Sequence, residues 1–196
     1  MTKEYLLIKF ADEKYVDDMY ENEYLYFNRF IGFRGSSKDE LGRYDPKEGN
    51  LMNKQLTYLK LKAMADGKEI VFGPGDNFNG QYCEHYNDPK LISCSLYGIT
   101  IDSPEMEFEI DEKAFGLGDK ALVINARPFW DLLDEIMEKD NRWYARKFVT
   151  YYDPKTYHGD LTFHHKDSSY SHQQEYRILK QVDDDSPVGI KIPGLK

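Results

Sequence analysis

The stretch Leu91–Thr100, LISCSLYGIT, is rich enough in apolar residues to form a strand that is buried on both faces. We therefore expect it to lie near the centre of a sheet, with other strands on both sides. It also carries two serines, Ser93 and Ser95. This segment decides the fold class, because a long central strand requires a sheet around it.

Shorter segments before and after this strand have the composition of strands, and two others have the period of a helix. The expected strands are residues 5–10, 24–27, 107–110, 121–125, 148–152, 161–165, 176–180 and 188–192, and the expected helices are residues 12–21 and 129–138. Residues 53–65 fit either type. Glycine, proline and polar residues predict irregular connections at residues 32–50 and 73–89.

This pattern predicts an α+β fold with a mixed or mainly antiparallel sheet and a few short helices. We expect a single domain over residues 1–196, because no linker or repeat interrupts the pattern and 196 residues suit one domain.

The net charge of -9 argues against a general nucleic-acid-binding surface, because binding to phosphates needs clustered lysine and arginine. A local basic groove stays compatible with it, as does mimicry of nucleic acid by a protein that inhibits a basic partner. The 16 tyrosines and 11 phenylalanines suit core packing and also flat ligands such as nucleobases.

Cys83 and Cys94 have no paired spacing, which favours a reducing compartment. The apolar run near the start is too short for a membrane span. We therefore expect a cytoplasmic protein without membrane contact.

A compact signature near the C-terminus reads Lys-x3-Tyr-x2-Gln-x-Glu-Tyr-Arg over residues 166–177. It resembles an uncharacterised family of small bacterial and phage proteins. In that family a similar signature follows a Gly-x-x-Ala-Leu-Val-Ile strand, an aromatic-bearing helix and a Val-x-Tyr strand, and residues 118–124, 129–133 and 149–151 match in order. The resemblance covers residues 90–180 and implies no chemistry.

Three further elements resemble the ADP-ribosyltransferase superfamily when taken in order. They are Arg29 after an early strand, Ser93-Cys94-Ser95 on the central strand, and Gln173-Gln174-Glu175 near the C-terminus. The intervals between them are longer than in compact members of that superfamily. The resemblance implies a split sheet and a protein that handles NAD, by ADP-ribose transfer or NAD hydrolysis, in a toxin, phage-defence or counter-defence setting.

The chemistry of that reaction gives each residue a role. Breaking the bond between nicotinamide and ribose develops oxocarbenium character, which a carboxylate can stabilise. Glu175 is the expected catalytic carboxylate. Gln173 would lie on the same side of an extended segment and orient the acceptor, which would be a host protein or a nucleic acid.

The other residues would hold the nucleotide. Arg29 would bind the diphosphate, and the Ser93 hydroxyl would fix the ribose or support Glu175, with Ser95 as a further residue of the cofactor-binding set. The rings of Tyr97 and Tyr170 would stack on nicotinamide or adenine.

Other interpretations fit the same residues. The chain could be a non-catalytic phage or mobile-element protein that binds a nucleotide signal or inhibits a host defence protein, or an interaction module without a nucleotide site. Glu175 and Arg177 could simply form an ion pair on an exposed edge.

A metal site is a weaker alternative, and we expect none. His164 and His165 would point to opposite faces of a strand, so at most one of them could join His158 or His172 around one ion. His172 could instead act as a general base beside Tyr170.

Overall fold

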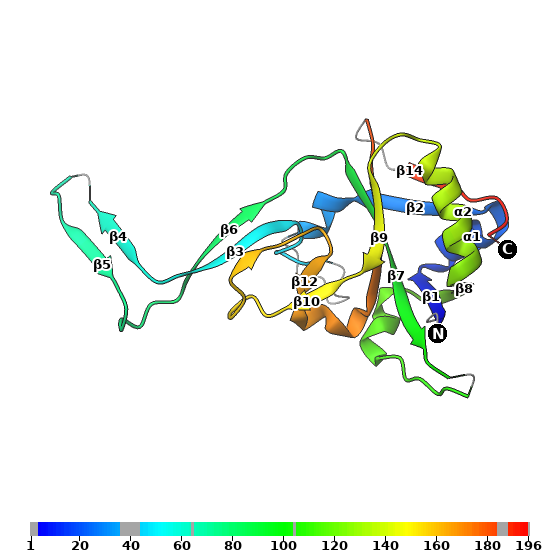
Figure 1. Ribbon diagram of the computed structural model, residues 1–196, viewed down its shortest axis with the longest axis horizontal. Coiled ribbons are helices and arrows are strands. Elements are labelled where there is room, and N and C mark those ends of the chain that lie inside the picture. The colour runs from blue at the N-terminus through cyan, green and yellow to red at the C-terminus, as the bar shows by residue number, and fades with distance from the viewer. Residues whose placement is uncertain (1–3, 36–43, 64, 104, 184–187, 196) are drawn as a thin grey trace.

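The computed structural model describes residues 4–35, 44–63, 65–103, 105–183 and 188–195. It has an α+β fold with mainly antiparallel strands and two α-helices, α1 (Glu13–Asn22) and α2 (Ala126–Glu138), which confirms the expected fold class. The main sheet has seven strands: β1 (Glu4–Ala11), β2 (Tyr24–Arg29), β7 (Leu91–Ile101), β8 (Lys120–Asn125), β9 (Tyr144–Phe148), β13 (Glu175–Gln181) and β14 (Val188–Lys191). Figure 1 shows this sheet with both helices at one end of the molecule.

Strand β7 is the centre of the sheet, as its apolar composition predicts. Tyr97 pairs with Ile8 of β1 and with Glu175 of β13, so these two strands lie on opposite edges of β7. Strand β2 pairs with Ile92 and Ser93, on the same edge as β1. Strands β1 and β2 therefore pair with different segments of one edge of β7.

The side chains of β13 alternate between two differently covered faces. Tyr176 and Ile178 face the apolar core beneath α2, where Phe129 and Leu133 are also buried. Glu175 and Arg177 face the opposite side. Both faces of β13 are buried, and the second face combines the charged Glu175 and Arg177 with the apolar Leu179.

Three smaller sheets cover the polar face or extend from it. They consist of β10 (Thr150–Tyr152) with β12 (His165–Asp167), of β11 (Gly159–Asp160), β3 (Asn50–Leu56) and β6 (Gly80–His85), and of β4 (Leu59–Lys62) with β5 (Glu69–Phe72). Short 3-10 helices complete the fold: η1 (Phe30–Arg34), η2 (Glu112–Leu117) and η3 (Ser168–Gln173).

Residues 50–85 form an arm that projects from the main sheet (Figure 1). Strands β3 and β6 form its base, and β4 and β5 form the outer ribbon. The base is fixed by the carbonyl of Pro154, which accepts hydrogen bonds from the side-chain amides of Asn53, Gln55 and Gln81.

Some expected elements are wrong. Residues 107–110 have no strand, and two of them, Phe108 and Glu109, instead line a cleft beside β7. Residues 73–89 are not irregular throughout, because they include β6. The strand expected at residues 161–165 does not form over that range, and β12 begins only at His165. Residues 36–43 of the expected 32–50 loop lie outside the described residues. In the described part of the chain, no helix has the length and apolarity needed to span a membrane.

Candidate functional site

Glu175 is the first residue of β13 and is almost fully buried. The chain enters this strand from η3 through Gln174, whose φ of 38° is left-handed. Gln174 thereby turns the backbone into the sheet, and its carbonyl accepts a hydrogen bond from Gly98 of β7 at 2.9 Å. This turn places the Glu175 carboxylate beside the middle of β7.

Three side chains donate hydrogen bonds to the Glu175 carboxylate. Ser95 Oγ donates to Oε1 at 2.5 Å, and Lys166 Nζ donates to Oε2 at 2.9 Å. Arg177 donates through Nε to Oε1 at 2.6 Å and through Nη2 to Oε2 at 3.0 Å. The carboxylate is therefore held in one orientation.

Arg177 also binds a second buried carboxylate, Glu48. Its Nη1 and Nη2 donate to Glu48 Oε1 and Oε2 at 2.6 and 3.1 Å, and Nη1 donates to the carbonyl of Phe163 at 2.5 Å. Lys166 Nζ lies 3.8 Å from Glu48 Oε2. We call Glu48, Lys166, Glu175 and Arg177 the buried ion cluster; its two positive and two negative charges balance.

The cluster fixes the ionisation of Glu175. Burial acts to raise the pKa of Glu175, but the charges of Arg177 and Lys166 and the hydrogen bonds from Arg177 and Ser95 outweigh burial, so the pKa lies well below its ordinary value. Burial dominates at Glu48 and raises its pKa. Glu175 is thus ionised at neutral pH and suits the stabilisation of positive charge better than proton transfer.

A cleft of about 380 Å³ opens where β13 leaves the edge of β7. Strand β13 begins opposite Tyr97, so the edge of β7 beyond this residue is not covered by β13. The cleft is lined by Tyr97, Gly98, Ile99, Thr100, Met106, Phe108, Glu109, Phe148, Val149, Tyr151, Gln174 and Glu175.

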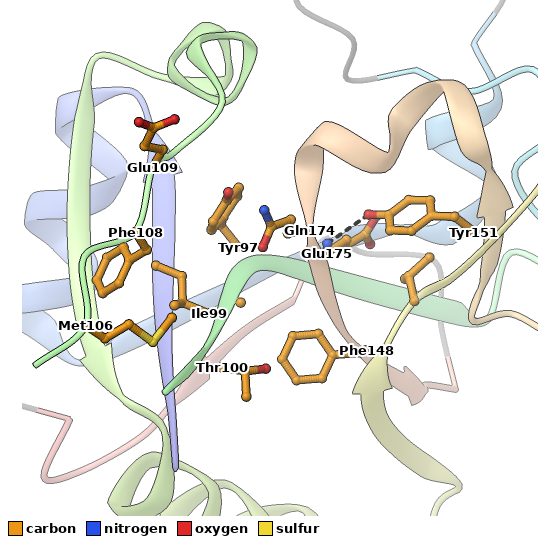
Figure 2. Close-up of a pocket in the computed structure, with 12 residues that line it drawn as sticks. Tyr97, Ile99, Thr100, Met106, Phe108, Glu109, Phe148, Tyr151, Gln174 and Glu175 are labelled. Atoms are coloured by element: carbon orange, nitrogen blue, oxygen red, sulfur yellow. Dashed lines mark hydrogen bonds between the residues drawn. The ribbon is translucent and has the colours of Figure 1, made fainter. Parts of the chain in front are cut away.

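Aromatic rings form much of the cleft wall. Figure 2 shows Met106 and Phe108 on one side and Phe148 and Glu175 on the other, with Tyr97 and Gln174 between them. Gly98 lets the Phe148 ring lie close over β7, because a Cβ at Gly98 would lie 2.3 Å from Phe148 Cε1.

Tyr151 joins the cleft to the buried ion cluster. Its hydroxyl accepts a hydrogen bond from the Glu175 backbone amide at 2.9 Å, which Figure 2 marks. Burial raises the pKa of Tyr151, so the phenol is neutral at physiological pH.

The structure brings together three of the residues singled out in the sequence. Tyr97 and Glu175 both line the cleft, and Ser95 binds Glu175. Ser93, the serine expected to support Glu175, lies two residues farther along the same face of β7, opposite Leu179; Ser95 makes the contact with Glu175 instead.

Gln173 and Tyr170 lie beside the cluster and do not line the cleft. The extended Gln173–Glu175 segment expected from the sequence is wrong, because Gln173 ends η3 and Gln174 is left-handed. Gln173 Oε1 nevertheless accepts a hydrogen bond from Lys166 Nζ at 2.8 Å. The ring of Tyr170 lies 5.3 Å from the same Nζ, and its hydroxyl donates to the carbonyl of Tyr44.

Arg29 is not brought to Glu175. It pairs with Ile92, whereas Glu175 pairs with Tyr97, which places their backbones five residues apart along β7, or roughly 16 Å. Its Nη1 donates to the carbonyl of Pro89 at 2.7 Å. The ion pair of Glu175 with Arg177 is present, but it is buried and does not lie on an exposed edge.

Sequence reasoning missed Glu48, and it considered His164 only as a possible metal ligand. Glu48 lies in an irregular segment with no motif, and only a long-range contact places it in the cluster. His164 is buried, and its pKa is lowered to about 4 by burial and by the charges of Arg177 and Lys147. Among the described residues, no group of three or more His, Cys, Asp or Glu side chains gathers as a metal site.

Comparisons of the chain with protein-family models, with curated proteins and with solved structures gave no match.

Proposed function

We propose that the protein binds a small planar ligand of the nucleotide class, NAD among them, in the cleft beside Glu175. The observation that carries this proposal is the combination of aromatic walls with a carboxylate that stays ionised. Aromatic side chains bind flat rings by stacking and tolerate many base types.

The size and charge of the cleft limit the kinds of ligand that can bind there. Ligand sites span about 300–1,000 Å³, so a cleft of about 380 Å³ suits one ring system with its sugar. The rest of a dinucleotide would lie outside it. Glu109 gives the cleft a negative charge, whereas the charge of Glu175 is balanced within the buried ion cluster; this lining favours a cationic ring such as the nicotinamide of oxidised NAD over a phosphate group.

The test compares the removal of a phenylalanine ring inside the cleft with the removal of one outside it. Phe108 lines the cleft, whereas Phe115 is exposed and stacks edge-on against Phe10 outside it. We expect Phe108→Ala to weaken the binding of NAD or nicotinamide mononucleotide about tenfold or more, because each stacked ring contributes about 1–3 kcal/mol. Isothermal titration calorimetry measures the affinity.

Phe115→Ala is the matched control and should bind as the unaltered protein does. The proposal fails if the unaltered protein binds neither nucleotide, or if both substitutions weaken binding equally.

A second candidate function is cleavage of NAD, by hydrolysis or by transfer of ADP-ribose to a host protein or nucleic acid. The hydrogen bond from Ser95 to Glu175 supports it, because this bond and Arg177 keep the carboxylate charged and in one orientation beside the cleft. Arg29 lies away from the cleft and has no part in this candidate.

The second candidate predicts that Glu175→Gln reduces NAD turnover at least a hundredfold, because the charge that stabilises the oxocarbenium ion is lost. Release of nicotinamide from NAD measures turnover. Glu175→Asp keeps the charge in the cluster and separates an effect on folding from an effect on chemistry, with near-ultraviolet circular dichroism as the check on folding. Absence of turnover in the unaltered protein, with NAD bound, rejects cleavage and leaves binding intact.

A further inference from the structure

The outer ribbon of the arm, β4 with β5, has one entirely apolar face. Leu59 pairs with Phe72 and Leu61 with Ile70, and directly paired residues of antiparallel strands point to the same face. We call these four residues the apolar face of the ribbon. The alternate pairs, Lys60 with Val71 and Lys62 with Glu69, form the opposite face, where Lys60 and Glu69 make an ion pair at 2.8 Å.

The described part of the chain leaves this apolar face largely uncovered. The ring of Phe78 stacks on Phe72 at 4.9 Å and shields the end near the arm base. Farther out, Leu61 and Ile70 are 47% and 56% exposed. The ribbon projects from the main sheet, so the body of the molecule does not cover it (Figure 1). An isolated two-stranded ribbon is marginally stable in water, and an exposed apolar face on it indicates an interaction surface.

The distribution of charge indicates which partner can approach. Residues 50–85 contain four lysines and four acidic residues, so the arm is neutral and the rest of the chain carries the whole net charge of -9. The acidic remainder of one chain repels that of a second chain, whereas two neutral arms do not repel each other. The arm spans about 13 residues from Asn50 to Lys62, or roughly 40 Å when extended. That distance is several times the Debye length of about 8 Å at physiological ionic strength.

We infer that the apolar face of the ribbon docks against the same face of a second copy of this chain. Leu61 and Ile70 of one copy then pack against Leu61 and Ile70 of the other copy, and a two-fold axis relates the two. Such an interface is self-complementary, because each copy presents an identical apolar stripe. The Lys60–Glu69 ion pair stays in water on the outer face.

The dimer should be weak and nearly insensitive to salt. Two ribbons of four-residue strands, each about 13 Å long, bury far less than the roughly 800 Å² per partner of a standard interface. We therefore expect dissociation constants in the micromolar range or above. Since the contact is apolar and the arms are neutral, raising the salt concentration should not dissociate it.

The test uses two neighbouring residues on opposite faces of one strand. Ile70 belongs to the apolar face and Val71 to the polar face, and their exposures, 56% and 50%, are nearly equal. Sedimentation velocity over about 1–500 μM protein measures the dimer fraction. We expect the unaltered protein and Val71→Glu to dimerise alike, and Ile70→Glu to weaken dimerisation at least tenfold. Near-ultraviolet circular dichroism confirms that both variants fold.

Two results overturn the inference. The first is a monomer for the unaltered protein throughout the concentration range. The second is a dimer that Ile70→Glu leaves intact, or that Val71→Glu weakens as much, because the contact then does not use the apolar face. Leu61→Glu should reproduce Ile70→Glu, since the two residues are paired. None of these residues lies at the cleft, so the result is independent of nucleotide binding.

Discussion

Replacing Arg177 by methionine should lower the free energy of unfolding by about 3–5 kcal/mol, as expected when one partner of a buried ion pair is removed. Arg177 is 2% exposed and binds both Glu48 and Glu175. Without it, two buried carboxylates share Lys166 as the only remaining positive charge of the cluster. Urea denaturation followed by circular dichroism measures the loss.

Arg146→Met is the matched control for this prediction. Arg146 also binds a carboxylate through two nitrogens, on Asp134, but both side chains of that pair are partly exposed. Ion pairs nearer to water contribute about 0–1 kcal/mol. If Arg177→Met destabilises the protein no more than Arg146→Met does, the buried ion cluster does not hold the site together.

Acid should destabilise the folded protein between about pH 6.5 and pH 4 through His164. Its pKa falls from 6.5 to about 4 on folding, because burial and the charges of Arg177 and Lys147 disfavour the imidazolium. In this interval the unfolded state binds the proton and the folded state does not, so stability decreases as the pH falls. The expected loss from this residue is about 3 kcal/mol.

The measurement is the free energy of unfolding at intervals from pH 7 to pH 4. His164→Gln should reduce the slope by the part that His164 contributes, because glutamine does not titrate; burial also lowers the pKa of His165 and of His85, and these residues keep their own parts. His158→Gln, at an exposed position, should keep it. A slope that survives His164→Gln unchanged would show that other groups cause the acid sensitivity.

The centre of the fold follows from the sequence because local signals there agree with the tertiary structure. Residues 91–100 are apolar enough to require burial, and they form β7. The strand at 176–180 and the helix at 129–138 are likewise present, as β13 and within α2. Ser95 and Glu175 were singled out by motif, and antiparallel pairing of β7 with β13 brings them together.

The rest of the site depends on contacts that a linear pattern does not contain. Glu48 reaches the cluster from a segment more than a hundred residues before Arg177, and its carboxylate has no local signal. Residues 107–110 alternate like a strand but form none; Phe108 and Glu109 line the cleft, and Ile110 packs against the small core cluster around Tyr97. Residues 53–65 were ambiguous because their apolar residues have mixed spacing, and the structure forms β3 and β4 there.

The most direct test of the nucleotide-binding proposal is to titrate the protein with NAD and follow the backbone amides by nuclear magnetic resonance. We predict chemical-shift changes centred on the cleft, at Gly98, Thr100, Phe108 and Gln174, with none on the arm ribbon at Leu61 and Ile70. If the chemical-shift changes saturate with NAD at other residues while the cleft amides do not change, this cleft is not the ligand site.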